Sequence, residues 1–206
     1  MTSLHPSAST SPLRLYGRRV VLRPLGLPDY PAWSEIRVRN GEWLTKWEPK
    51  RSSVQADPTY DQSAFATRCA QRDRERQTGT GYGFGLFVGP ALVGEINLNG
   101  VMRGSMQTGT IGYWIDQKHA GQSLVAEGVV VLLKHAFEEL RLHRLEICII
   151  PRNTNSHRVV EKLEIRSEGV AERFLEINGT WEDHARYAIT AEEWNNRRSE
   201  LLERWL

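Results

Sequence analysis

The junction between residues 111 and 124 combines residue types and a spacing that indicate chemistry. An apolar and aromatic run at 111–116 favours a strand, residues 117–120 form a loop, and Gly121 opens a long helical pattern. A glycine at this turn lets backbone N–H groups approach an anion closely, and the positive end of the helix dipole favours phosphate. The junction therefore predicts a pyrophosphate cradle, although a glycine at a helix start is also an ordinary turn device.

The histidines and cysteines do not indicate a metal site. Four histidines and both cysteines lack close ligand spacing: His119, His143, His157, His184, Cys69 and Cys148. Lone histidines are more often packing residues than catalysts, so His143 and His184 are expected to be structural hydrogen bonders. Two cysteines are too few for a disulfide framework, which favours a reducing compartment.

The elements that must position the junction begin with a strand and two helices. Residues 15–23 alternate as a strand does, Asp29 is suited to cap a helix, and a second helix is expected over about 59–77. Between these helices, Trp43 and Trp47 either fill gaps between the helices or line a substrate groove. Both interpretations stay open.

From residue 82 the pattern changes to short strands. Runs at 82–88, 91–99 and 108–116 predict an antiparallel meander. The helix from Gly121 carries an apolar stripe at helical spacing: Val125, Val129, Leu132, Leu133, Ala136, Phe137 and Leu140. A β-branched strand at 144–150 and an Asn-rich helix start follow. Strand, helix, strand implies a right-handed crossover and a parallel pair.

The last elements are a hairpin and a helix. Strands at about 169–177 and 180–189 flank Asn178-Gly179, a dipeptide suited to a tight hairpin turn. Thr190 and Glu193 have capping-box spacing, which predicts a C-terminal helix.

Length and composition favour one soluble domain. The chain has 206 residues, 40% of them hydrophobic, enough for a substantial core. Its 27 Lys and Arg against 25 Asp and Glu give a formal charge of +2, with no basic block typical of nucleic-acid or membrane binding. Residues 1–13 are rich in Ser, Thr and Pro and lack a signal-peptide core. We expect a flexible tail at 1–13, a single domain at 14–206 and a cytoplasmic location.

From Leu15 to about Glu193 the chain resembles the GNAT superfamily of N-acetyltransferases. Members carry a Gln/Arg-x-x-Gly-x-Gly/Ala loop after their fourth strand, and the matching segment here is Lys-His-Ala-Gly-Gln-Ser at 118–123. Lys118 keeps a cationic donor, while Ser123 either crowds the phosphates or offers them a hydroxyl. Resemblance and strand order together predict an α/β (α+β) GNAT fold: a mixed, mostly antiparallel sheet of about seven strands, splayed at a central parallel pair, with helices on both faces.

Four further segments are similar to the RimJ/RimL-type branch, whose members acetylate protein N-termini. They are Tyr113-Trp114-Ile115, Leu142-His143-Arg144-Leu145-Glu146, Pro151-Arg152-Asn153-Thr154-Asn155-Ser156, and Trp181 with Asp183-His184. That branch usually continues Lys-Leu-Gly-Phe after the third segment, and here Glu164 replaces the glycine. Because Glu is strained in a left-handed conformation, we expect the helix end to be disturbed.

The resemblance implies a site for acetyl-CoA, whose pantetheine arm would insert between the splayed strands like an extra strand. The implied cofactor-binding residues are Trp114, Ile115, Asp116, Lys118, Ala120, Gly121, Gln122, Ser123, Leu124, Asn153 and Ser156. Asn153 and Ser156 also suit helix capping, and the two roles are compatible. No metal is implied.

The implied reaction is attack of a neutral amine on the acetyl thioester. A base is useful, and Glu95 is the leading candidate because it shares one strand face with Asn97. A solvated strand glutamate is the competing interpretation. Ser156 is the expected proton donor to sulfur, with Tyr113 in reserve.

The expected activity is acyl transfer to the N-terminal α-amine of a protein, ribosomal-protein-like by resemblance. Two alternatives stay open: a small amine acceptor (amino acid, polyamine or antibiotic), and a non-catalytic acyl-CoA-binding protein, favoured by the departures at Lys118, Ser123 and Glu164. A homodimer is one way to bury Trp181, Trp194 and Trp205, and packing on the protein's own core is the other.

Overall fold

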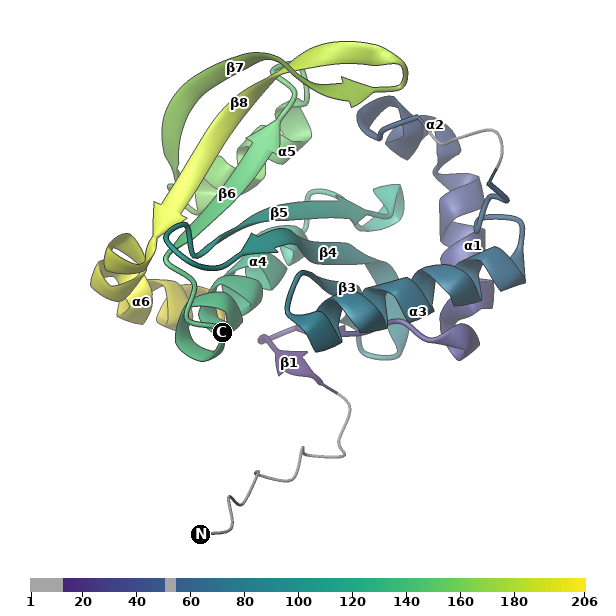
Figure 1. The fold of residues 1–206 in the computed structure, drawn as a ribbon. Coiled ribbons are helices and arrows are strands. Elements are labelled where there is room, and N and C mark those ends of the chain that lie inside the picture. Colours follow the sequence, from purple (N-terminus) through teal and green to yellow (C-terminus); the bar gives the residue numbers. More distant parts are fainter. Residues whose placement is uncertain (1–12, 51–54) are drawn as a thin grey trace, which may run out of the picture.

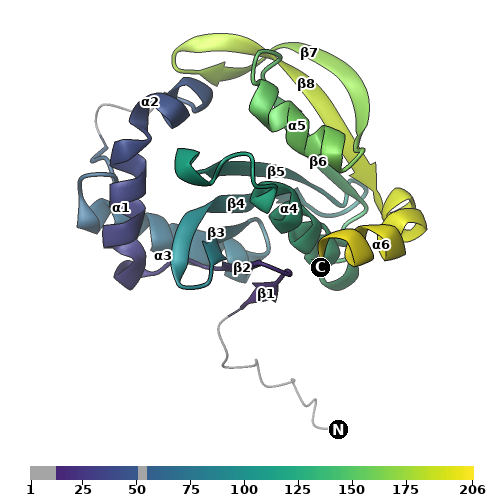
Figure 2. The same cartoon turned by 180° about the vertical axis from the view of Figure 1, so that it is seen from behind.

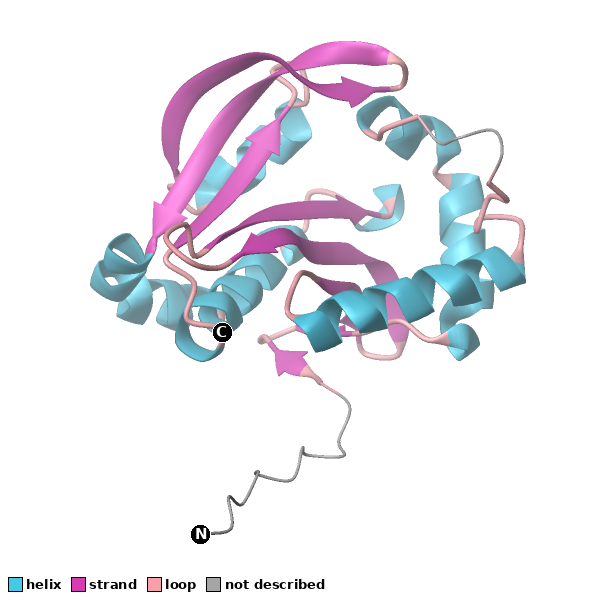
Figure 3. Ribbon diagram, viewed as in Figure 1, coloured by secondary structure: helices cyan, strands magenta, loops and turns pink. Residues whose placement is uncertain are grey.

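The protein is built on one eight-stranded sheet (Figures 1 and 3). The computed structural model describes residues 13–50 and 55–206, so residues 1–12 of the expected tail lie outside the described residues. The strand order is β1-β2-β3-β4-β5-β6-β8-β7. The strands are β1 Leu15–Tyr16, β2 Val20–Arg23, β3 Tyr82–Val88, β4 Ala91–Met102, β5 Thr108–Ile115, β6 Arg144–Ile149, β7 Arg166–Ile177 and β8 Thr180–Thr190. Among these described strands, only β5 and β6 run parallel.

Helices cover both faces of the sheet, as predicted. In Figure 1, α3 lies in front of the sheet and α1 stands at the edge of the sheet, behind α3, whereas α4, α5 and α6 lie on the other side, which Figure 2 shows. The helices are α1 Tyr30–Arg39, α2 Gly41–Leu44, α3 Gln62–Thr78, α4 Leu124–Lys134, α5 Thr154–Lys162 and α6 Ala191–Trp205. Three short 3-10 turns lie in connecting segments: η1 Leu27–Asp29 before α1, η2 Thr45–Trp47 after α2 and η3 Gln117–His119 between β5 and α4. A π-helical turn, His135–Glu139, extends α4. No described helix is long and apolar enough to cross a membrane.

The first predicted strand differs from the structure, because residues 15–23 form a hairpin of β1 and β2. The N–H of Gly17 donates to the carbonyl of Val20 and closes the turn. The buried carboxylate of Glu127 on α4 then accepts hydrogen bonds from the backbone N–H groups of Arg19 at 2.5 Å and Val20 at 3.0 Å. The turn that separates β1 from β2 therefore depends on Glu127, a residue more than 100 positions away in the sequence.

α4 is the centre of the core. Every residue from Leu124 to Leu133 is buried, because this helix lies under the sheet and beside α5 and α6. Gly128 allows the close approach, since a Cβ there would overlap Cδ1 of Ile96 on β4. Trp194 of α6 is buried and stacks on Phe137, and Trp205 also packs on the core. These two tryptophans cover the protein's own core, whereas Trp181 is 62% exposed.

The parallel pair splays, as the resemblance implies. β5 and β6 pair only from Thr108 with Arg144 to Thr110 with Glu146, and the two ribbons then diverge in Figure 1. Beyond Thr110, β5 keeps β4 as its neighbour and β6 keeps β8. The sheet is thus two smaller sheets joined by three residue pairs.

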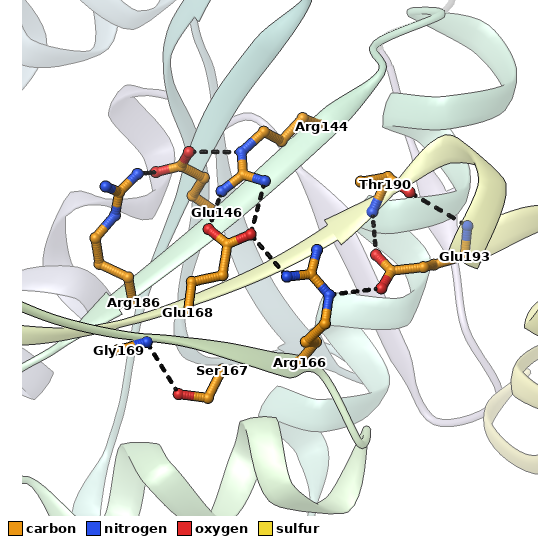
Figure 4. A network of polar contacts seen from close by, with 9 residues as sticks. All are labelled: Arg144, Glu146, Arg166, Ser167, Glu168, Gly169, Arg186, Thr190 and Glu193. Carbon is orange, nitrogen blue, oxygen red and sulfur yellow. Dashed lines mark hydrogen bonds and ion pairs between the residues drawn. The ribbon is translucent and has the colours of Figure 1, made fainter.

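Ion pairs connect β6, β7 and β8, the strands on one side of the splay, near the residues where β6 still pairs with β5 (Figure 4). Glu146 accepts from Arg144 at 2.7 Å and from Arg186 at 2.8 Å. Glu168 on β7 accepts from Arg144 and from Arg166, which also contacts Glu193 at the start of α6. The network therefore joins β6 to β7 and β8, and β7 to the start of α6, beside the three residues of β6 that pair with β5.

The end of α5 keeps the geometry of a glycine cap despite Glu164. This residue has φ +50, and the N–H of Ile165 donates to the carbonyl of Val160, as in a helix ended by a left-handed residue. The expected disturbance therefore takes the form of backbone strain at Glu164. Asn178 and Gly179 both have positive φ in the β7–β8 turn, as predicted, and the Thr190–Glu193 capping box is present.

Asp116 at the end of β5 fixes the loop that leads to α4. Its fully buried carboxylate accepts hydrogen bonds from Arg39 Nη2 at 2.6 Å and Asn40 Nδ2 at 2.8 Å, and His119 Nδ1 lies 3.1 Å away. Asn40 Oδ1 accepts from the N–H of Gln117. Burial alone would raise the pKa of Asp116, but these hydrogen bonds hold it well below its usual range.

Replacing Glu164 with glycine should stabilise the protein. Relief of left-handed strain, about 1–2 kcal/mol, exceeds the extra unfolded-state entropy of glycine, about 0.5–1 kcal/mol. We expect the free energy of unfolding in urea to rise by roughly 0.5–1 kcal/mol. Glu164→Ala keeps the Cβ and should change it little, so equal effects of the two variants would contradict the explanation.

Asp116→Asn should lower the free energy of unfolding by about 2 kcal/mol at pH 7. Because the folded pKa of Asp116 is depressed, its stabilisation is present above its unfolded pKa of about 4 and is lost as pH falls through that value toward the folded pKa. The difference between wild type and variant should therefore shrink below about pH 4. Glu35→Gln, which removes the exposed second partner of Arg39, is the matched control and should change stability by less than about 0.5 kcal/mol. A pH-independent difference would refute this role.

Candidate active site

A cavity of about 530 Å³ lies where β5 leaves β6. The α1–α3 face of the sheet lines it with Trp33, Arg37, Arg68, Glu95 and Trp114, and the α4–α5 face lines it with Tyr113, Val125, Asn153, Ser156 and Val159. A second cavity of about 170 Å³ continues between Tyr113 and the β6 residues 147–149. The splay therefore makes one space accessible from both faces of the sheet.

The register of β4 and β5 explains why the two catalytic candidates face opposite ways. Glu95 pairs with Trp114, and Ile96 pairs with Tyr113. Paired residues share a face and neighbours alternate, so Glu95 lies with α1 and α3, and Tyr113 with α4 and α5. They share a cavity because, among the described strands, none pairs with the far side of β5 beyond Thr110.

Glu95 is buried, with 1% of its surface exposed, and it lines the cavity. Its carboxylate accepts hydrogen bonds from Trp33 Nε1 and from Arg68 Nη2, the latter at 2.5 Å. Burial would raise the pKa of Glu95, but the Arg68 charge and these hydrogen bonds outweigh burial and lower it. Glu95 is therefore a buried, ionised carboxylate, not the solvated strand glutamate of the competing interpretation.

Tyr113 and Ser156 lie next to each other. The Tyr113 hydroxyl donates to the backbone carbonyl of Ser156 at 3.2 Å, and burial raises the pKa of Tyr113, so the phenol keeps its proton. Asn153 caps α5 by accepting from the N–H of Ser156 at 3.3 Å. The capping role predicted for Asn153 is confirmed, whereas Ser156 lies inside the first turn of α5 and lines the cavity.

The open edge of β5 offers backbone groups to a ligand. The N–H of Asp116 donates to Val93 on β4, and hydrogen bonding alternates along the register. The N–H groups of Tyr113 and Ile115 therefore point away from β4, toward the splay. The carbonyl of Ile115 accepts from Trp43 Nε1 at 3.1 Å.

The expected phosphate loop lines a separate cavity of about 110 Å³. Gly121 has φ +79, and a Cβ at this position would have no atom within 4 Å, so its backbone angle and not crowding demands glycine. Ser123 also has a left-handed φ of +62, just before α4 begins at Leu124. Ala120, Gly121, Ser123 and Leu124 line this cavity, whereas Lys118 and Gln122 do not.

Several lining residues were missed from the sequence. Trp33, Arg37 and Arg68 come from helices that precede the meander, and nothing local marks them. Arg37 forms a two-pronged ion pair with Glu48 at 2.6 Å. Trp43 and Trp47, for which groove and gap-filling roles were open, both line the cavity. On α5, the spacing of Arg158 and Lys162 was a usable signal, because residues four apart share a helix face.

Comparison with known proteins agrees with this geometry. Residues 19–166 match the family model described as acetyltransferase (GNAT) domain. The probable N-acetyltransferase YjcK of Bacillus subtilis (strain 168) is 33% identical over 177 residues, covering 85% of this chain and 96% of that protein. The [ribosomal protein uS5]-alanine N-acetyltransferase of Escherichia coli (strain K12) is 29% identical over 186 residues, covering 88% and 93%.

A solved structure supports the same assignment. Mycobacterium smegmatis RimJ in complex with CoA-disulfide has a TM-score of 0.85 and 30% identity, with 94% of each chain covered. The likeness therefore takes in nearly the whole chain and is not confined to the loop before α4. The chain belongs to the GNAT family of N-acetyltransferases, and its relatives are of the RimJ/RimL type.

Proposed function

We propose that this enzyme transfers the acetyl group of acetyl-CoA to the α-amino group of a protein N-terminus. The observation that carries the proposal is the single cavity reached from both faces of the sheet at the β5–β6 splay. One side presents unpaired strand N–H groups to an acyl-pantetheine arm, and the other presents a buried carboxylate to an amine. The relative named for alanine of ribosomal protein uS5 supports a protein acceptor.

The residues present fit acetyl-CoA. The N–H groups of Tyr113 and Ile115 have no partner among residues 13–50 and 55–206, so they can bind the amide carbonyls of the pantetheine arm, as an added strand would. The backbone from Ala120 to Leu124 borders the loop cavity at the first turn of α4, where N–H groups lack helical partners and favour the diphosphate. Asp116 contributes indirectly, by fixing this loop to α1.

Glu95 acts on the acceptor side. A carboxylate with a lowered pKa is a weak base, so it attracts and orients the amine before the reaction. It takes a proton once the bond between nitrogen and the acetyl carbon has formed, because that nitrogen is then far more acidic than the free amine. An α-amine, with a pKa of about 8, is partly neutral at physiological pH, whereas a lysine ε-amine, with a pKa of about 10.4, is almost wholly protonated.

Ser156 acts on the thioester side. Its hydroxyl passes a proton to the departing CoA thiolate and regains one from water, which receives the proton that Glu95 took from the amine, so the proton lost by nitrogen ends on sulfur. The hydrogen bond from Tyr113 to the Ser156 carbonyl holds this helix start against β5. Tyr113, whose phenol keeps its proton, is the alternative donor. Substituting Glu95, Ser156 and Tyr113 one at a time and measuring the turnover of each variant therefore distinguishes their roles.

Acetyl-CoA and a lysine-free peptide with a free α-amine should give a singly acetylated product, measured by mass spectrometry. The apparent second-order rate should rise with pH and level off near the α-amine pKa of about 8, because Glu95 is ionised throughout. An N-terminally blocked peptide with an internal lysine should react far more slowly. Preference for a polyamine, a free amino acid or an antibiotic amine would favour a small-molecule acceptor.

Matched variants separate the catalytic roles. Glu95→Gln should lower the rate about 10²-fold, whereas Glu203→Gln, an exposed glutamate on α6, should not. Ser156→Ala should lower kcat by a similar factor without changing the KM for acetyl-CoA. A larger loss of kcat for Tyr113→Phe than for Ser156→Ala would reassign the proton donor to Tyr113.

A further inference from the structure

Two cations on α5 face the loop that precedes α4. Arg158 and Lys162 lie one helical turn apart, and both line the cavity of about 110 Å³ beside Gly121 and Ser123. Lys162 Nζ donates a hydrogen bond to Ser123 Oγ at 2.7 Å. This contact joins residues 39 positions apart and links the end of α5 to the start of α4.

The charges around this cavity are unbalanced. No Asp or Glu is among its described lining residues, which include His119 as well as Arg158 and Lys162. Within residues 13–50 and 55–206, Arg158 makes no hydrogen bond or ion pair, and the only polar partner of Lys162 is the neutral Ser123 hydroxyl. The larger cavity differs, because its buried Glu95 and Arg37 are each paired with an opposite charge.

We propose that Lys162, assisted by Arg158, binds the diphosphate of acetyl-CoA, and that Ser123 is the partner on which Lys162 rests when no diphosphate is bound. The inference deepens the proposed function and rests on it. An ammonium bonded to a hydroxyl gains a stronger, charge-assisted partner when a phosphate oxygen arrives. The displaced Ser123 hydroxyl is then free to donate to the same anion.

The family loop carries Gly or Ala where this chain has Ser123, and the proposed contact gives the serine a function. Gly or Ala at position 123 would leave the lysine without a side-chain acceptor in the loop. Serine supplies that acceptor from a left-handed backbone, with φ +62, at the position that borders the phosphate cavity. Ser123 therefore does not block the phosphate site; its hydroxyl positions the Lys162 ammonium beside it.

Calorimetric titration with three probes tests the proposal: CoA, 3′-dephospho-CoA and pantetheine. Lys162→Met should weaken CoA binding about 10-fold or more, the effect of losing a hydrogen bond to a charged group. 3′-Dephospho-CoA, which keeps the diphosphate, should lose as much, and pantetheine, which has no phosphate, should be unaffected. Arg158→Met should give a smaller loss with the same pattern. Ser123→Gly should weaken CoA binding less than Lys162→Met, because the lysine stays and only the hydroxyl that positions it and donates to the anion is removed.

Lys134→Met is the charge-matched control, because Lys134 is exposed at the far end of α4 and lines neither cavity. It should bind CoA as wild type does. A Lys162→Met protein that melts as wild type does and binds CoA equally well would overturn the proposal. So would a loss seen with CoA but not with 3′-dephospho-CoA, which would place Lys162 at the 3′-phosphate, or an equal loss with pantetheine, which would make the lysine structural.

These outcomes are distinct from failure of the proposed function. If wild type binds none of the three probes, the acetyl-CoA site itself is refuted, and the inference falls with it. If wild type binds CoA and acetylates peptides but Lys162→Met does both equally well, only the inference falls.

Discussion

β5 has β6 as a neighbour for only three residues, and the rest of the active site depends on the edge that this leaves open. Backbone N–H groups inside a protein are normally hydrogen-bonded, and in a sheet their partners are neighbouring strands. An open strand edge inside the molecule is therefore a place where a ligand can bind as an added strand. The edge stays open because each strand is held on its other side. Asp116 ties the end of β5 to α1, and the ion pairs around Glu146 and Glu168 tie β6 to β8 and β7.

The open edge of β5 lies between two chemically different environments, one on each face of the sheet, and the cavity connects them. On the α1–α3 face, the buried Glu95 and Arg37 are neutralised by Arg68 and Glu48, so the chamber is lined by tryptophans and balanced charges. Unpaired charges at this depth would be costly, which explains the pairing. On the α4–α5 face the cations have no carboxylate partner among the described residues that line the loop cavity. An amine suits the first environment and a diphosphate the second.

Local patterns predicted most of the fold because they report neighbours in sequence. The meander, the Asn178-Gly179 turn and the Thr190–Glu193 capping box all follow from short-range periodicity or backbone preference, and all are present. The split of residues 15–23 was missed because it depends on Glu127, far along the chain. The loop and the splay were predicted by resemblance, whereas the partners of Glu95 were not, because Trp33 lies 62 residues away and Arg68 lies 27 away.

The central claim is that the acyl-pantetheine arm lies along the open edge of β5. Residue-resolved amide hydrogen exchange, with and without saturating acetyl-CoA, tests it directly. The N–H groups of Tyr113 and Ile115 should become strongly protected, whereas those of Gly112 and Trp114, which already face β4, should change much less. Saturable binding of acetyl-CoA with no added protection at Tyr113 and Ile115 would contradict the account, because the ligand would then lie elsewhere.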